Sequence, residues 1–174
     1  MGKTGHCQHP NERETVMQKI KPCLWFDNQA EEAVNLYVSL FDNSRILNTS
    51  YYGEGSGPQE GTVLTVEFEL DGVQHQALNG GPQFTFSEAI SLSVTTESQE
   101  ETDELWTKLT ADGGEESMCG WLKDRFGLSW QIMPRQLGEM MGDPDPDKAG
   151  RVMQSMLGMR KINISELQKA SDGV

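Results

Sequence analysis

Apolar and polar residues alternate most clearly in the segment from residue 62 to residue 70. Every second position from Leu64 to Leu70 is apolar, whereas Thr65, Glu67 and Glu69 between them are polar. A strand that buries one face shows this period of two. Asp71-Gly72 follows and favours a two-residue hairpin turn, which predicts a return strand from Val73 to Asn79.

A helical period precedes this hairpin. Apolar residues in segment 29–41 recur at helical spacing, and Asp27 or Asn28 can cap the helix; the apolar positions are Ala30, Ala33, Val34, Tyr37 and Phe41. Shorter patterns predict strands at 17–26 and 44–52. The first half therefore has the order strand, helix, strand and hairpin.

The same order restarts near residue 90. Apolar residues alternate in a strand at 90–94, and Ser98 with Glu101 forms a capping box at the start of a helix. Strand-like stretches follow near 115–121 and 128–133. The repeat predicts a duplicated module, in which each sheet buries one face under a helix and leaves the other to line a shared cleft.

The chain divides into three predicted parts. Residues 1–15 are polar and contain Gly and Pro, so we expect a disordered arm. Residues 16–134 form an α+β domain with modules at about 16–82 and 88–134. Residues 135–174 form a helical extension, and its expected helices span 135–141, 147–158 and 163–170.

Composition excludes several functional classes. The chain has 174 residues and a net charge of -13, which argues against a nucleic-acid partner because phosphate binding requires clustered Lys and Arg. No run approaches the roughly 18 apolar residues that span a bilayer, and residues 1–15 lack an apolar signal-peptide core. The three widely spaced cysteines do not predict a disulfide framework. We expect a cytoplasmic protein with no membrane partner.

Several segments resemble the PhnB-like proteins in order and spacing. They are Pro22-Cys-Leu-Trp-Phe26 leading into Ala30-Glu-Glu-Ala-Val-Asn-Leu-Tyr37, Ala77-Leu-Asn-Gly-Gly-Pro82, Phe84-Thr-Phe-Ser-Glu-Ala-Ile-Ser91, and Cys119-Gly-Trp-Leu-Lys-Asp124 with Ser129-Trp-Gln-Ile-Met-Pro134. The resemblance covers roughly residues 17–160. It implies the glyoxalase/bleomycin-resistance/extradiol-dioxygenase (vicinal oxygen chelate) superfamily, whose fold pairs two βαβββ modules around a small-molecule cleft. It also implies a homodimer. Some PhnB-like proteins carry the label 3-demethylubiquinone methyltransferase, but no glycine-rich nucleotide loop follows a strand in this sequence.

The resemblance also predicts where a metal would bind. Metal-dependent relatives take four ligands (His, Glu or Gln) from the first, fourth, fifth and eighth strands. The corresponding positions fall near Cys23, at Ala77 or Leu78, near Ala89 and at Gln131. Only Gln131 is a familiar ligand type, and one such residue does not hold a metal ion. We therefore expect no standard metal site and no cofactor.

The predicted cleft combines polar and aromatic residues. His75 is the candidate catalytic acid or base because its pKa suits neutral pH, although a half-exposed strand histidine is the simpler interpretation. Glu67 and Glu69 fit either paired cleft carboxylates or a solvated face. The remaining candidates for ligand binding are Cys23, Trp25, Asn79, Ser91, Ser129 and Gln131.

Three functions fit this cleft. The first is a PhnB-like enzyme that acts on a small metabolite without the standard metal. The second is a protein that binds and sequesters a small molecule, as antibiotic-resistance members of the superfamily do. The third is a metal-dependent lyase, isomerase or dioxygenase with atypical ligands. The sequence does not identify the small molecule.

Overall fold

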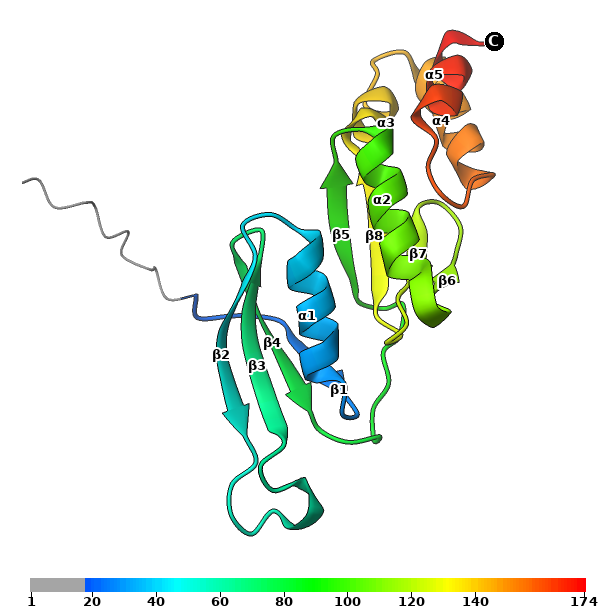
Figure 1. Cartoon of the computed structure of the whole chain (residues 1–174). Helices are drawn as coiled ribbons and strands as arrows, with labels where there is room; N and C mark the ends of the chain where they lie inside the picture. Colours follow the sequence, from blue (N-terminus) through cyan, green and yellow to red (C-terminus); the bar gives the residue numbers. More distant parts are fainter. Residues whose placement is uncertain (1–17) are drawn as a thin grey trace, which may run out of the picture.

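The computed structural model describes residues 18–174 (Figure 1), and the arm predicted at residues 1–15 lies outside this range. The first module contains β1 (Cys23–Phe26), α1 (Ala30–Leu40), β2 (Arg45–Tyr51), β3 (Val63–Leu70) and β4 (Val73–Asn79). Its sheet has the order β1-β4-β3-β2. Strand β1 runs parallel to β4, and the other neighbours are antiparallel. We call this the first sheet.

The second module repeats that topology. It contains β5 (Ser91–Thr96), α2 (Gln99–Thr110), β6 (Glu115–Glu116), β7 (Trp121–Lys123) and β8 (Ser129–Pro134). The second sheet has the order β5-β8-β7-β6, again with one parallel pair, β5 and β8. The predicted α+β fold of paired βαβββ modules is confirmed.

Two local signals act as the sequence predicts. Asp71 and Gly72 both have positive φ, as a tight hairpin turn between β3 and β4 requires. Ser98 Oγ accepts a hydrogen bond from the Glu101 amide at 3.2 Å. The Glu101 carboxylate accepts one from the Glu97 amide at 2.7 Å, which completes a reciprocal cap at the start of α2.

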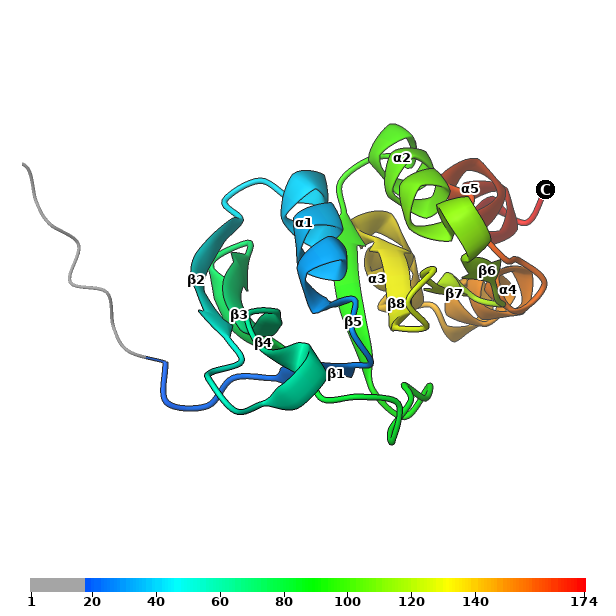
Figure 2. The same cartoon turned by 60° about the horizontal axis from the view of Figure 1, so that its bottom comes forward.

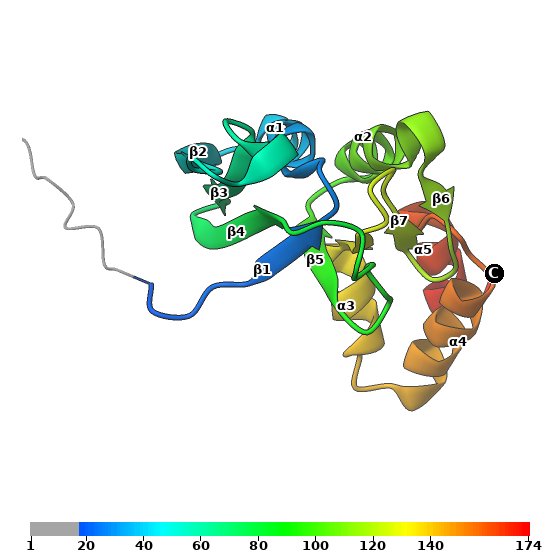
Figure 3. The ribbon, with the colours of Figure 1, turned by 90° about the horizontal axis from the view of Figure 1, so that it is seen from below.

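One core joins the two modules. Helix α1 packs on the first sheet and α2 on the second, and their buried side chains belong to one continuous cluster. The ring of Tyr37 from α1 meets the ring of Trp130 from β8 edge to face at 5.2 Å, and Phe41 stacks on the same indole. Figure 2 shows α1 between the first sheet and the second module, and Figure 3 shows both helices on one side of the molecule. Each sheet therefore has a face covered by its helix and an open face.

A buried carboxylate also connects the modules. Asp124, which is 3% exposed, lies in the turn after β7. One oxygen accepts hydrogen bonds from the backbone amides of Phe126 and Leu128, and the other accepts from the Tyr37 hydroxyl and the Trp130 indole, at 2.7–3.0 Å. Burial raises the pKa of Asp124, and these hydrogen bonds oppose that rise.

The C-terminal extension forms a small helical unit with its own apolar cluster. Its helices are α3 (Arg135–Met141), α4 (Pro146–Leu157) and α5 (Ile164–Asp172). The segment between α4 and α5 docks on the second module, because the amides of Cys119 and Gly120 each donate a 2.7 Å hydrogen bond to it. Within residues 18–174 no helix is long and apolar enough to cross a membrane.

Candidate functional site

The open face of the first sheet carries a row of polar side chains. Cys23 of β1, Gln76 of β4 and Glu67 of β3 are neighbours in register. The ammonium group of Lys21 contacts the Glu67 carboxylate. The next row contains Trp25, whose indole nitrogen donates to the Gly81 carbonyl at 2.9 Å. The structure thus places the predicted Cys23 and Trp25 on the open face.

The open face of the second sheet carries hydroxyl and amide groups. Ser91, Ser129 and Gln131, all predicted cleft residues, lie on this face because Trp130 and Ile132 of the same strand turn into the core. The Gln131 amide donates to the Ser91 hydroxyl at 2.8 Å. Ser129 is 1% exposed, and its hydroxyl has no hydrogen-bond partner among residues 18–174.

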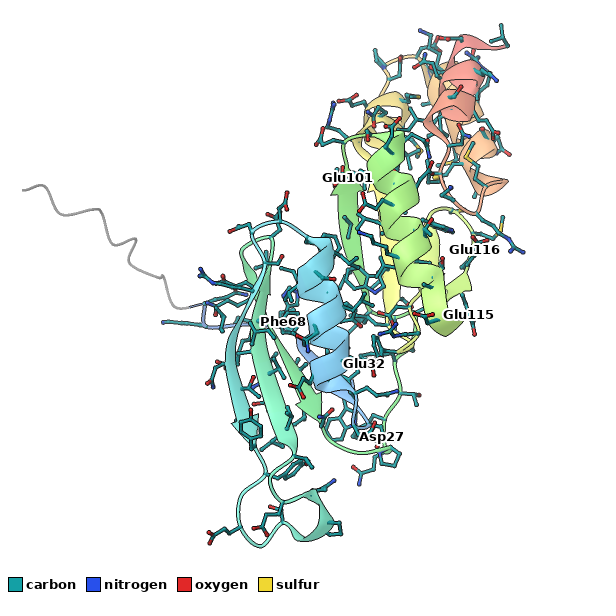
Figure 4. The ribbon with its side chains drawn as sticks, in the orientation of Figure 1. Asp27, Glu32, Phe68, Glu101, Glu115 and Glu116 are labelled. Atoms are coloured by element: carbon teal, nitrogen blue, oxygen red, sulfur yellow. The ribbon has the colours of Figure 1, made fainter. Side chains whose placement is uncertain are left out.

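The structure places His75 and Asn79 on the covered face of the first sheet, contrary to the expected cleft position. His75 is 5% exposed, stacks on Phe68 beside α1 (Figure 4), and lies with its Nδ1 atom 2.9 Å from the Val73 carbonyl. Asn79 accepts a 2.8 Å hydrogen bond from the first amide of α1. Side chains alternate between the two faces of a strand, and both residues lie on the side of β4 on which Ala77 enters the core.

The burial of His75 predicts a pH-dependent stability. Burial lowers the pKa of its imidazole, so the unfolded chain takes up a proton before the native state does. The stability that this group contributes is present above its unfolded pKa of about 6.5 and is lost as the pH falls below that value. In urea unfolding between about pH 8 and pH 5, the wild type should lose more stability on acidification than His75→Phe. Parallel pH profiles of the two proteins would contradict this.

The other titratable groups of the first open face are a thiol and two carboxylates that contact basic residues. Burial raises the pKa of the Cys23 thiol, and the nearby Lys21 opposes the rise only in part. Glu67 contacts Lys21, and Glu69 lies 3.0 Å from the Arg45 guanidinium. The carboxylates that the sequence left open as an acid–base pair therefore each form an ion pair with a basic residue.

The side chains at the four metal positions are poor ligands. On the open faces these positions hold Cys23, Leu78 rather than Ala77, the serines of β5 rather than Ala89, and Gln131. A thiol, an alkyl group, a hydroxyl and an amide do not match the carboxylate-rich or imidazole-rich sets that metal ions prefer. Among residues 18–174, no three His, Cys, Asp or Glu side chains gather into a possible metal site.

Two pockets lie beside the sheets, and one of them is on an open face. One of about 620 Å³ lies where α1 begins, beside the β2–β3 connection, and is lined by Asp27, Glu31, Tyr51 and Tyr52 among others. The other, of about 460 Å³, lies on the open face of the second sheet and is lined by Ser129, Trp121 and Lys123 among others. The sequence pattern alone does not single out Lys123 or Gln76. Lys123 pairs in register with Ser129, and Gln76 pairs with Cys23, so both lie on open faces.

A family model described as 3-demethylubiquinone-9 3-methyltransferase matches residues 18–133. The chain belongs to this family, the PhnB-like proteins. The match ends before the C-terminal helices, to which the expected resemblance extended. A comparison with curated proteins finds no match.

Solved structures agree with this assignment. A PhnB protein from Bacillus cereus is 40% identical, with a TM-score of 0.62, over 67% of this chain and 99% of that chain. A protein from Pseudomonas aeruginosa is 20% identical, with a TM-score of 0.56, over 68% of this chain and 98% of that chain. This second similarity supports the fold alone. The family match and the Bacillus cereus structure identify a PhnB-like protein.

Proposed function

We propose that this PhnB-like protein binds a small organic molecule on the open faces of its two sheets, within a homodimer. The observation that carries the proposal is that each sheet is covered by a helix on one face only. The other face presents Trp25 and Cys23 on the first sheet, and Ser91 and Gln131 on the second. Polar groups set among aromatic side chains are typical of small-molecule sites.

Binding without general acid–base catalysis is the form of this function that we favour. His75 lies on the covered face, the Cys23 thiol has a raised pKa, and Glu67 is in an ion pair. A catalyst near neutral pH needs a group that titrates there and reaches the ligand. An enzyme on the same cleft, with or without an atypical metal, is the competing function. Turnover of a bound compound, or a stoichiometric metal in elemental analysis, would favour the enzyme over the binding protein that we propose.

A thermal-shift screen of small polar and aromatic compounds tests the proposal. A compound that binds the native state should raise the unfolding temperature. Gln131→Ala should weaken its binding by about 2- to 10-fold, the usual worth of one hydrogen bond. Gln168→Ala, on the exposed side of α5, is the matched control and should bind as the wild type does. Sedimentation of the same samples should give twice the 19.4 kDa mass of one chain.

Two outcomes would overturn this proposal. One is a screen in which no compound stabilises the protein. The other is a set of bound compounds whose affinity changes equally in Gln131→Ala and in Gln168→Ala, because the open face would then not be the site. A sedimentation mass of a single chain would remove the homodimer from the proposal.

A further inference from the structure

The pocket of about 460 Å³ on the second sheet is built across one row of the open face. Ser129, Lys123 and Glu115 are neighbours in this row on β8, β7 and β6. Trp121 contributes to the lining from the next row, and Glu88 contributes from the connection between the modules. The volume lies within the range of about 300–1,000 Å³ that small-molecule sites occupy.

One polar atom in this pocket lacks a partner. Ser129 lines the pocket and is 1% exposed, but its hydroxyl makes no hydrogen bond within residues 18–174. A buried polar group left unpaired costs about 1–3 kcal/mol, so such groups in native proteins nearly always have a partner. A hydroxyl both donates and accepts, and a ligand with an N–H or O–H group would satisfy it.

The charges around the pocket indicate whether that ligand is a cation or an anion. Its lining contains the acidic residues Glu88, Glu115 and Glu116 and a single ammonium group; Glu116 pairs with the core residue Leu122, so its side chain points to the covered side of the sheet. That ammonium, on Lys123, already lies 2.5 Å from Glu88. The Glu116 carboxylate accepts a 2.7 Å hydrogen bond from the Trp106 indole of α2 and lies 3.6 Å from the Arg160 guanidinium. Glu115 forms no ion pair within the described chain, although it neighbours Lys123 in register, and it lies on β6 beside the end of α2 (Figure 4). An anion would have to displace Glu88 from Lys123, whereas a cation would meet the Glu115 carboxylate without displacing a salt bridge.

The apolar part of the lining indicates that the uncharged portion of the ligand is apolar. The half-buried indole of Trp121 offers an aromatic surface, and Met118, 45% exposed, lies on the adjoining β6–β7 turn with Cys119. An aromatic face attracts a cation by about 0.5–2 kcal/mol, and Met adapts to varied apolar shapes. We propose that this pocket binds a small organic amine in its cationic form. The ammonium group bonds the Ser129 hydroxyl and the Glu115 carboxylate, and the apolar body lies against Trp121.

This inference deepens the proposed function, because the pocket belongs to the same open face. The test compares three probes that share one body: phenethylamine, phenethyl alcohol and phenylpropionate. Calorimetric titration of the full chain should show the amine binding about tenfold more tightly than the carboxylate, which corresponds to about 1.4 kcal/mol, with the alcohol between them. Raising the NaCl concentration from about 50 to about 500 mM should weaken the binding of the amine more than that of the alcohol.

Three variants locate the binding. Ser129→Ala should weaken the binding of the amine by about 2- to 10-fold. Glu115→Gln should reduce the preference of the amine over the alcohol. Glu54→Gln removes the same charge from the exposed β2–β3 connection and should change neither value. Unfolding temperatures of the free variants verify that each is folded.

The inference is overturned if none of the probes binds, if the carboxylate binds as tightly as the amine, or if Ser129→Ala and Glu115→Gln both bind the amine like the wild type. Its failure is distinguishable from that of the proposed function. A neutral or anionic compound from the screen that depends on Gln131 but not on Glu115 would retain the small-molecule site and remove only the amine.

Discussion

Replacing Asp124 with Ala should lower the free energy of unfolding by about 3–5 kcal/mol, because each buried donor left without an acceptor costs about 1–3 kcal/mol. The substitution leaves the backbone amides of Phe126 and Leu128, the Tyr37 hydroxyl and the Trp130 indole without their acceptor. None of these donors can turn to water without opening the core, since Tyr37 and Trp130 are almost fully buried. The loss should appear in urea unfolding as a lower midpoint.

Two further variants sharpen this prediction. Asp124→Asn keeps the shape but points an NH₂ group at two of the four donors, so it should lose about 2–3 kcal/mol. Asp172→Ala removes an exposed carboxylate near the end of α5 and should change stability by no more than about 0.5 kcal/mol. If Asp124→Ala loses less than about 1 kcal/mol, the carboxylate does not hold α1 against the second module.

Local patterns predicted the elements of this fold well. The alternation from Leu64 to Leu70 gave the correct faces of β3, since Val66 and Phe68 are fully buried. The capping box at Ser98 and the hairpin at Asp71-Gly72 form as expected. These signals succeed because each depends on residues only a few positions apart.

The candidate site was harder to predict, because strand parity and distant partners decide it. Strand β4 has only Val73, Ala77 and Leu78 as apolar residues, so its pattern fits either phase. Ala77 packs in the core, and His75 lies on the same side of the strand, so its side chain is on the covered face. The network of Asp124 depends on Tyr37, which is 87 positions away in the sequence. The predicted strand at 115–121 is interrupted over residues 117–120, within which Cys119 and Gly120 have positive φ.

Replacing Gly120 with Ala should lower the free energy of unfolding by about 2–3 kcal/mol, of which the left-handed backbone accounts for about 1 kcal/mol. Gly120 has a φ of +79°, and an added Cβ would lie 2.9 Å from the Ile132 carbonyl and 3.1 Å from the Ile162 side chain. Backbone on one side and the docked extension on the other leave little room for it. The amide of Gly120 also donates to the Arg160 carbonyl, so the strain should loosen the segment between α4 and α5.

Gly127→Ala is the matched control, because Gly127 has a φ of +87° but no atom within 4 Å of an added Cβ. It should lose only the backbone part, about 1 kcal/mol. Hydrogen exchange should then show faster exchange of the amides around residues 159–162 in Gly120→Ala than in Gly127→Ala. Equal losses in the two variants would mean that the added methyl group meets no resistance at Gly120.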